Sequence, residues 1–278
     1  MGTAPIKPPV AASFPISGAQ LKEIFPTTDQ SRCDEVAEII NKYSDKFEIN
    51  TPLRMAHFLG QIGWESAQLK AMGEKSGEGT CYKKASAGWS IWFSLTWKEI
   101  PFNKDCSDAP DDSQKSQKIK KNGWSSINDV PKKYICDGGE VEKSEAGKNL
   151  FCYVYRCEGG NGDENSCDGY RYRGHGIMQL TWKKQYESFN KWLISQGFDN
   201  DYKQVLTDPD EGFKDKDIDV LSGLWFWAKN DCNQEADKLD ENCSQNEYDK
   251  LTKKINNGLL ESNKRKQLFL KTYEILKK

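Results

Sequence analysis

The sequence predicts a mainly helical protein, with strand limited to short pieces. Apolar residues recur three and four positions apart over much of the chain, which is the period of an α-helix that faces a core. Two segments also begin with typical helix starts: Ser17 precedes "GAQLKEIF", and Thr51 precedes Pro52. Thirty-six per cent of the residues are hydrophobic, and nine Trp, 12 Phe and 11 Tyr give enough apolar volume for a sizeable core.

The expected helices follow one another from Gly18 to about Leu69 and again from Trp182 to the C-terminus. Val36, Ile39, Ile40 and Tyr43 share one helical face. "DIDVLSGLWFWAKN" is apolar nearly all round, which predicts a central buried helix with Trp225 and Trp227 in the core. The last segment should hold two helices with a break at residues 256–258.

Two stretches should lie outside this helical core. Residues 1–16 are rich in Pro and Ala and lack the charged start and apolar run of a secretory signal, so they are predicted as a linker or an added terminal segment. Residues 17–278 are predicted as a single folded domain, cut from a longer polypeptide. Within it, residues 75–147 are rich in Gly, Ser, Lys and Asp and predict a long insertion of loops and short elements.

The nine cysteines favour disulfides in an oxidising compartment. The chain has no CxxC pair and only two histidines, His57 and His175, so we expect neither a zinc site nor another metal or cofactor. His57 is expected to be a hydrogen-bonded structural residue. Connectivity stays open: Cys232 and Cys243 flank one short loop and are one candidate pair, while Cys81, Cys106 and Cys136 would pin the insertion.

Charge and hydropathy exclude two classes of partner. The 40 basic and 42 acidic residues nearly balance, which gives no case for nucleic-acid binding. No stretch approaches the roughly 18 consecutive apolar residues of a membrane span. No coiled-coil heptads appear, and we expect a monomer.

One carboxylate falls where the pattern calls for an apolar residue. Phe58, Ile62 and Leu69 recur on one helical face, and Glu65 lies on the same face. A carboxylate is costly to bury unless it is paired, hydrogen-bonded or protonated. Glu65 therefore either reaches solvent at the edge of the stripe or has a function.

Several motifs, which follow one another along the chain, suggest a function for Glu65. They are "RMAHFLGQIGWES", followed by Glu74 nine residues after Glu65, then "NGDENSCDGYRYRGHGIMQLT", "DPDEGF", "GLWFWAKND" and "LTKKINNGLLESNKR". Together they resemble the glycoside hydrolase family 19 chitinases, and particularly the bacterial and phage branch that includes cell-wall lysozymes. The resemblance runs from about Ile16 to the C-terminus. It implies a lysozyme-like, two-lobed helical fold with a substrate cleft, and inverting hydrolysis of β-1,4-linked N-acetylated amino sugars.

The resemblance also implies roles for residues that match the motifs. Glu65 matches the general acid and Glu74 the general base, with Glu78 as the alternative base. The other matches are Gln179 and Thr181, which would hold substrate and help place the attacking water, Asn256, which would contact the sugar, and Arg265, which would support the carboxylates. The chain departs from the family at Trp64, Ala67, His175, Gln185 and Asn257, which puts substrate preference in doubt more than catalysis.

Four further side chains are predicted to contact substrate: Trp64, Tyr172, His175 and Gln185. Aromatic rings can stack on pyranose rings, and Trp64, Trp124, Tyr170, Tyr172 and Trp182 are candidates, with core packing as the alternative for each. A charged run, "KSQKIKK", is most simply a solvated surface, and could also attract anionic wall polymers.

The chemistry places two demands on the structure. The acid must keep its proton near neutral pH, which apolar surroundings favour. An inverting pair also needs carboxyl groups about 6.5–9.5 Å apart. Nine residues of straight helix rise about 13 Å, so the helix should end near Ala71–Gly73 and the chain turn back.

The leading interpretation is a peptidoglycan hydrolase that cuts the bond between N-acetylmuramic acid and N-acetylglucosamine. Such a protein would be secreted or delivered to a bacterial cell envelope, as part of a phage lysin or an antibacterial toxin. Its partners would be peptidoglycan glycan strands and, for a toxin, a cognate immunity protein. The alternatives are a chitinase, a lytic transglycosylase and a catalytically inactive cell-wall-binding module.

Overall fold

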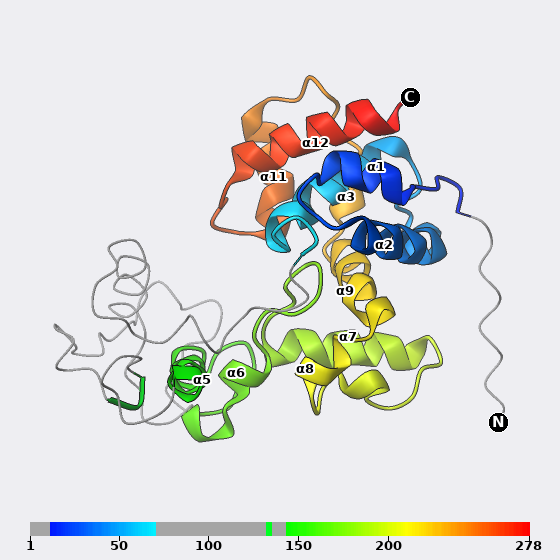
Figure 1. Ribbon diagram of the computed structural model, residues 1–278. Helices are drawn as coiled ribbons and strands as arrows, with labels where there is room; N and C mark the ends of the chain where they lie inside the picture. Colours follow the sequence, from blue (N-terminus) through cyan, green and yellow to red (C-terminus); the bar gives the residue numbers. More distant parts are fainter. Residues whose placement is uncertain (1–11, 71–131, 135–142) are drawn as a thin grey trace. The chain divides into compact units, whose positions relative to one another are not determined.

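The computed structural model describes residues 12–70, 132–134 and 143–278 (Figure 1). The chain divides into two compact units, the first made of Met1–Gly73, Gly174–Leu180 and Phe189–Lys278, the second of Glu74–Arg173 and Thr181–Ser188. The predicted mainly helical class is confirmed: across the described residues the one β-pairing is an isolated bridge between His175 and Leu180. In these same ranges no helix combines the length and the apolar character needed to cross a bilayer.

Most of the helices in the described ranges belong to the first unit. They are α1 (Gly18–Ile24), α2 (Gln30–Tyr43), η1 (Ser44–Phe47), α3 (Pro52–Glu65), η6 (Tyr202–Gln204), α8 (Pro209–Gly212), α9 (Lys216–Lys229), α10 (Cys232–Ala236), α11 (Gln245–Ile255) and α12 (Ser262–Leu276). Helix α7 (Lys183–Ser195) starts among residues of the second unit and ends among those of the first.

The two predicted helix starts are confirmed. Ser17 and Gln20 form a reciprocal capping box at α1. At α3 the Thr51 hydroxyl accepts a hydrogen bond from the Arg54 backbone N–H at 3.2 Å, and Pro52 occupies the first turn. Packing begins earlier than Gly18, because Ser13 bonds to Asp45 and the buried Ile16 bonds to Asn41.

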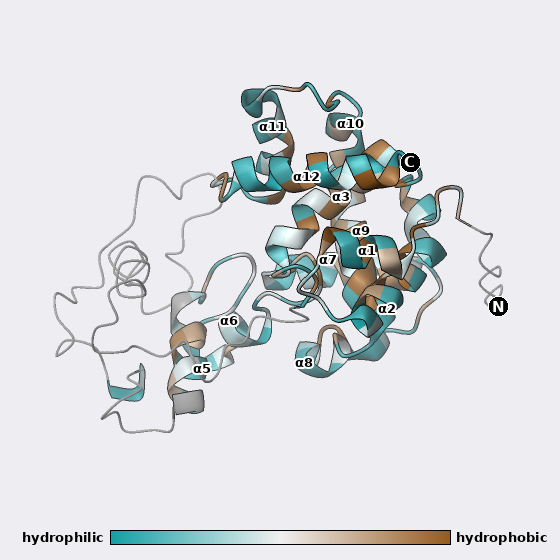
Figure 2. Cartoon of the chain, turned by 45° about the horizontal axis from the view of Figure 1, so that its top comes forward, coloured by the Kyte–Doolittle hydropathy of each residue, from teal (hydrophilic) through white to brown (hydrophobic). Residues whose placement is uncertain are grey.

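The core of the first unit forms where α3 packs on α12 and α2 packs on α1 and α9. Figure 2 shows hydrophobic residues on α2, α3 and α9. As predicted, α9 is the buried central helix: Leu221, Trp225 and Trp227 are all buried, and the Trp227 ring meets Phe58 edge-on at 5.5 Å. The expected break in the last segment is confirmed between α11 and α12.

The backbones of α3 and α12 come close together at Gly60. A Cβ atom added there would lie 3.0 Å from the Phe269 Cβ and 3.1 Å from its Cα and N. Any side chain at position 60 would therefore have to push the backbone of α12 away, and this contact fixes how far apart the two helices lie.

His57 is buried beside that crossing, as a structural residue. Its Nε2 lies 2.9 Å from the Leu239 carbonyl oxygen, and its ring stacks on Phe269 with centroids 3.7 Å apart. The prediction that His57 is hydrogen-bonded and structural is confirmed. Burial lowers the pKa of its imidazole to about 4.

We expect His57 to make the fold less stable in mild acid. In the unfolded chain the imidazole titrates near pH 6.5. As the pH is lowered from 6.5 to about 4, the unfolded chain therefore takes up a proton that the folded protein does not. The free energy of unfolding decreases over this range by about 3 kcal/mol in all. Urea unfolding at pH 4, 5, 6 and 7 measures this slope. His57→Gln should be less stable at pH 7 yet show a flatter slope, and equal slopes for the two proteins would contradict the prediction.

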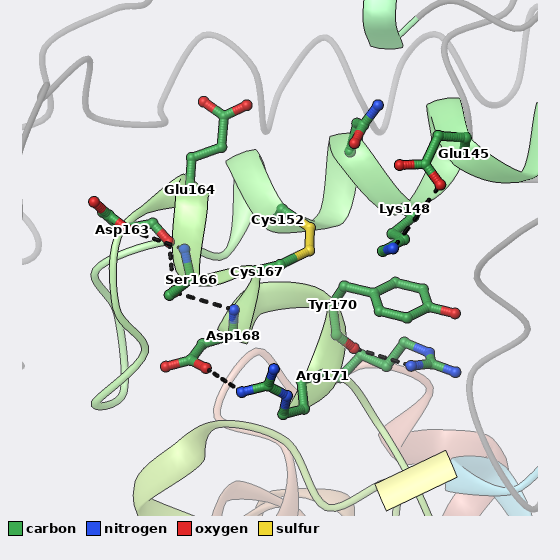
Figure 3. The surroundings of a disulfide bond; sticks show 12 residues. Glu145, Lys148, Cys152, Asp163, Glu164, Ser166, Cys167, Asp168, Tyr170 and Arg171 are labelled. Carbon is green, nitrogen blue, oxygen red and sulfur yellow. Dashed lines mark hydrogen bonds and ion pairs between the residues drawn. A yellow bond between two sulfur atoms is a disulfide. The ribbon is translucent and has the colours of Figure 1, made fainter. Parts of the chain in front are cut away.

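Short elements and a disulfide, whose surroundings Figure 3 shows, make up the part of the second unit that the structure describes. The elements are η4 (Lys132–Tyr134), α5 (Lys143–Val154), η5 (Glu164–Ser166) and α6 (Asp168–Arg171). The Cys152–Cys167 disulfide joins α5 to the residue before α6. Next to it the buried Asp168 carboxylate pairs with Arg171 and with Lys183, at 3.3 Å and 3.0 Å. The expectation of disulfides is confirmed here.

The candidate pair Cys232–Cys243 is wrong. Both thiols are free and buried, and the Cys232 sulfur lies 3.9 Å from the Asn230 carbonyl oxygen. Cys33 is free as well. Cys81, Cys106 and Cys136 lie outside the described residues, as do most residues of the predicted insertion 75–147. Helix α5 begins at Lys143, inside that predicted insertion.

Candidate active site

Glu65 is the last residue of α3, and its carboxylate is paired. The Arg265 guanidinium of α12 lies 2.5 Å from it, between Nη2 and Oε1. The Arg265 side chain is 2% exposed and that of Glu65 is 18% exposed. A carboxylate on an apolar stripe is thus tolerated because a buried cation from another helix meets it.

Arg265 is itself held in place by two further groups. Its Nη1 donates to the Gln61 Oε1 at 3.1 Å and its Nε to the Leu260 carbonyl oxygen at 3.0 Å. Gln61 is buried and donates in turn to the Thr252 hydroxyl at 3.1 Å. Because Gln61 and Glu65 are four residues apart on α3, both face the same guanidinium. Sequence reasoning missed Gln61, although a polar residue one turn before Glu65 was a usable signal.

Glu65 thus combines apolar neighbours on its own helix with a cation from α12. Phe58 and Ile62 are buried on the same helix as predicted. The carboxylate itself faces a guanidinium, which comes from a residue 200 positions later in the chain. No local pattern around Glu65 could reveal that contact.

The chain leaves the helical path directly after the acid, so the expected helix end near Ala71–Gly73 is wrong. The Ser66 hydroxyl donates to the Ile62 carbonyl at 2.7 Å and accepts from the Leu69 N–H at 2.9 Å. Ala67, Gln68 and Leu69 have φ values of 48°, 63° and 66°, in the left-handed region. Leu69 is buried as the stripe predicted, but from this turn. Glu74 and the alternative base Glu78 lie outside the described residues.

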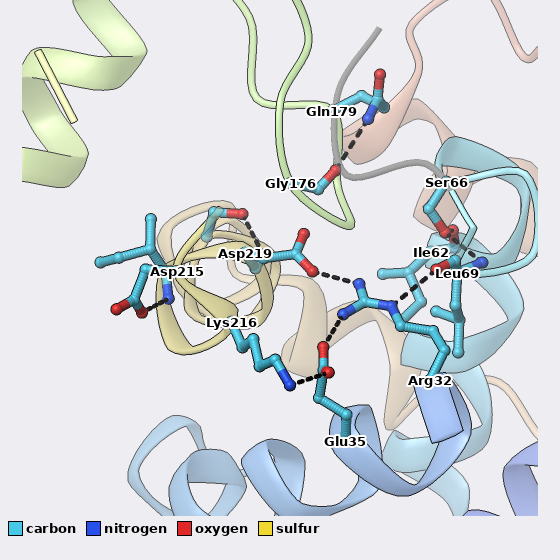
Figure 4. Close-up of polar contacts among 12 residues, drawn as sticks. Arg32, Glu35, Ile62, Ser66, Leu69, Gly176, Gln179, Asp215, Lys216 and Asp219 are labelled. Atoms are coloured by element: carbon cyan, nitrogen blue, oxygen red, sulfur yellow. Dashed lines mark hydrogen bonds and ion pairs between the residues drawn. The ribbon is translucent and has the colours of Figure 1, made fainter. Parts of the chain in front are cut away.

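A network of ion pairs that includes the buried Asp219 anchors this turn (Figure 4). Arg32 of α2 donates from Nε to the Leu69 carbonyl oxygen at 3.1 Å and pairs with Asp219 of α9. Its second partner is Glu35, at 2.6 Å, which Lys216 also contacts at 2.6 Å. Burial raises the pKa of the Asp219 carboxyl to about 6, although Arg32 opposes the shift.

The loop that carries Gln179 is hydrogen-bonded to Asp219 of α9, the residue that also pairs with Arg32. The Ile177 N–H donates to the Asp219 carbonyl oxygen at 3.3 Å, and the Gln179 amide donates to the Gly176 carbonyl at 3.0 Å. Gly176 has φ 75°, and a Cβ there would lie 2.2 Å from the Ser222 hydroxyl. Only glycine fits this position. Asp219 thus links the turn after Glu65 with the loop of Gln179.

The other predicted site residues of the first unit occupy different settings. His175 is 2% exposed, with its Nε2 3.1 Å from the Asp210 carboxylate. Asn256 is half-buried at the end of α11, where its side-chain oxygen accepts from the Gly258 N–H at 3.1 Å. Trp64, next to Glu65, is 39% exposed. The structure brings Glu65 and Arg265 into direct contact, and the roles of the other residues stay predictions.

Three predicted substrate contacts belong to the second unit. Tyr172 is buried and packs against Tyr186, with ring centroids 5.2 Å apart, which favours the core role for this ring. Thr181 and Gln185 are half-buried just before and within the first turn of α7. Trp124 lies outside the described residues. Over the part of the chain that the structure describes, no cluster of three His, Cys, Asp or Glu side chains could hold a metal ion.

Comparisons with known proteins agree with the motifs. The chain is 32% identical over 137 residues to a glycosyl hydrolase family 19 domain-containing protein of Haemophilus influenzae, which is 49% of this chain and 58% of that protein. It is also 32% identical over 90 residues to chitinase 4 of Oryza sativa subsp. japonica, which is 29% of this chain and 28% of the chitinase. No protein-family model matches the chain. The chain thus spans less than two thirds of either relative, and its resemblance to glycoside hydrolase family 19 is confirmed.

Proposed function

We propose that this protein is a glycoside hydrolase that cleaves the β-1,4 bond between N-acetylmuramic acid and N-acetylglucosamine in peptidoglycan. The observation that carries the proposal is the Glu65–Arg265 pair at the end of α3. The acid that the motifs select is the residue that ends a buried helix, partly exposed and held by a fixed cation. The similarity to a family 19 glycosyl hydrolase supports the same reaction class.

The geometry suggests how the two residues would share the work. Glu65 would donate its proton to the glycosidic oxygen as the bond breaks, which leaves a carboxylate on the enzyme. Arg265, already 2.5 Å away, would stabilise the carboxylate that forms. In the inverting mechanism a second carboxylate activates water on the far side of the sugar, and Glu74 is the proposed base. Gln179, Thr181 and Asn256 would position the sugar and the water.

The substrate and the setting are part of the proposal. Resemblance to the bacterial and phage branch of the family supports peptidoglycan, whereas similarity to chitinase 4 supports the alternative, a chitinase. We propose that the protein acts as a monomer in a bacterial cell envelope, after secretion or delivery as a lysin or toxin. A producing cell would then need an immunity protein that blocks it.

Product analysis separates these candidates. Purified sacculi and a soluble chitin oligomer are incubated with the full chain, and the released fragments are identified by mass. We expect reducing-end muropeptides from sacculi, with the inverted α-anomer seen first by NMR. Anhydro ends would indicate a lytic transglycosylase, and release from chitin alone a chitinase. Binding to sacculi without release would contradict the proposed hydrolysis and favour an inactive binding module.

A further inference from the structure

A groove of about 520 Å³ lies beside the end of α3, within the first unit. This volume falls in the range of small-ligand sites, roughly 300–1,000 Å³. The end of α3 and the turn after it line the groove together with one face of α12, and the loop after α1 contributes Thr27. The lining residues are Thr27, Gly63, Trp64, Ala67, Gln68, Lys70, Lys264, Gln267, Leu268 and Lys271.

The groove adjoins the candidate acid. Trp64 lines it and Glu65 follows Trp64 directly, so the two side chains leave α3 about 100° apart. On α12 the same relation holds between Lys264, which lines the groove, and Arg265, which meets Glu65. A ligand in the groove would therefore lie on the face next to the one that carries the acid.

Trp64 gives the groove a flat apolar surface. Its side chain is 39% exposed, which is unusual for so large a hydrophobic residue. The Lys264 ammonium lies 5.2 Å from the centre of its ring. The apolar face of a pyranose ring can pack on such a surface, while Gln68, Gln267 and Thr27 offer amide and hydroxyl groups to the sugar's polar edge.

Basic residues gather along the groove. Lys70, Lys264 and Lys271 line it, and among the described residues that line it none is acidic. Lys271 is fixed, because its ammonium donates to the Glu23 and Ile24 carbonyl oxygens at 2.8 Å and 3.0 Å. Lys264 pairs with Glu261, whose side chain is 38% exposed, and Lys70 makes no ion pair with any residue that the structure describes. Lys70 is thus available to an anion, and Lys264 would reach one by leaving Glu261, a surface ion pair of the kind that stabilises little.

We propose that this groove binds an acidic amino sugar, with Trp64 stacked on the pyranose ring and Lys70 and Lys264 bound to a carboxylate that the sugar carries. The inference rests on the proposed function, because it names the part of the peptidoglycan strand that lies beside the acid. The carboxylate is that of the lactyl group of N-acetylmuramic acid or of its peptide. Chitin carries neither group, so the groove would favour peptidoglycan over chitin.

Calorimetric titration of the full chain tests the groove, with Glu65→Gln as the parent so that ligand is not cleaved. The probes are neutral di-N-acetylchitobiose, the disaccharide of N-acetylglucosamine and N-acetylmuramic acid, and the same disaccharide with its tetrapeptide. We expect the acidic probes to bind about 10-fold more tightly than the neutral one. Tighter binding of the tetrapeptide form than of the plain disaccharide would identify the peptide carboxylate as the source.

A double lysine variant, a Trp64 variant and a matched control test whether the lysines cause the preference for the acidic probes. Lys70→Gln with Lys264→Gln should remove the 10-fold preference, and Trp64→Ala should weaken all three probes about equally. The matched control is Lys191→Gln with Lys250→Gln, which removes two charges at exposed positions on α7 and α11 and should keep the preference. Unchanged selectivity in the groove variant, or equal loss in the control, would overturn the assignment.

The groove and the proposed hydrolysis can fail separately. The first case is that wild type cuts sacculi, and that Lys70→Gln with Lys264→Gln, made with Glu65 in place, binds and cuts as well as wild type. The groove assignment is then overturned and the proposed function stands. If wild type cuts nothing but its lysine-dependent preference for the acidic probes persists, the groove assignment stands as a binding site and the hydrolysis fails.

Discussion

Glu65→Gln is expected to lower the rate of fragment release from sacculi by ~10²–10⁴-fold, the usual contribution of a general acid. The amide has no acidic proton to donate, yet its oxygen can still accept a hydrogen bond from the Arg265 Nη2. The loss should therefore fall on the bond-breaking step, with binding to sacculi retained. The measurement is the initial rate of reducing-end release under identical conditions for both proteins.

A matched substitution separates catalysis from folding. Glu38→Gln makes the same chemical change at an exposed position of α2 and should leave the rate within about 2-fold, as surface substitutions usually do. Circular dichroism should show that all three proteins are folded. If Glu65→Gln keeps more than a tenth of the wild-type rate while folded, Glu65 is not the acid.

Arg32→Met is expected to destabilise the fold by on the order of 3–5 kcal/mol at pH 7.5, because it leaves the Asp219 carboxylate buried without its cation. The loss should shrink towards pH 5. There Asp219, whose pKa burial raises to about 6, can take up a proton and become neutral. Urea unfolding at the two pH values gives the difference.

The double variant Arg32→Met with Asp219→Leu tests the cause. Replacing a buried ion pair by apolar residues of similar size is often nearly neutral, so most of the stability should return. Arg32 also bonds to Leu69 in the turn after Glu65, so both variants should lose activity even where the double variant is stable. A double variant as unstable as the single one would show that the charge of Asp219 is not the source of the loss.

The helices that carry the site could be predicted because their signals are local. Thr51 as a cap, followed directly by Pro52, marks the start of α3, and the apolar stripe marks the buried face of the helix. The stripe also drew attention to Glu65, since a carboxylate on it has to be explained. The helical spacing gave a wrong backbone conformation for Leu69. The residue is buried, as the spacing indicates, but it belongs to a turn of three left-handed residues after the end of α3, and no side-chain pattern predicts that turn.

The contacts that hold the site could not be predicted, because they join distant parts of the chain. Arg32 and Asp219 are 187 residues apart, and Glu65 and Arg265 are 200 apart. In the sequence each is one charged residue among many. Arg265 could be named only through the resemblance of "LTKKINNGLLESNKR" to a family motif. Gln61, which holds Arg265 in place, belongs to the motif that contains Glu65, and it was overlooked because Glu65 was the residue that needed an explanation.

The crossing at Gly60 has a consequence for how this protein could change in evolution. The close contact of Phe269 with Gly60 holds α12 against α3, and the same pair of helices carries Arg265 and Glu65. Lys264, Gln267 and Trp64 lie on a neighbouring face of the two helices. If the proposed groove selects the polymer, mutations on this face would change the preferred substrate while the Glu65–Arg265 pair keeps its geometry.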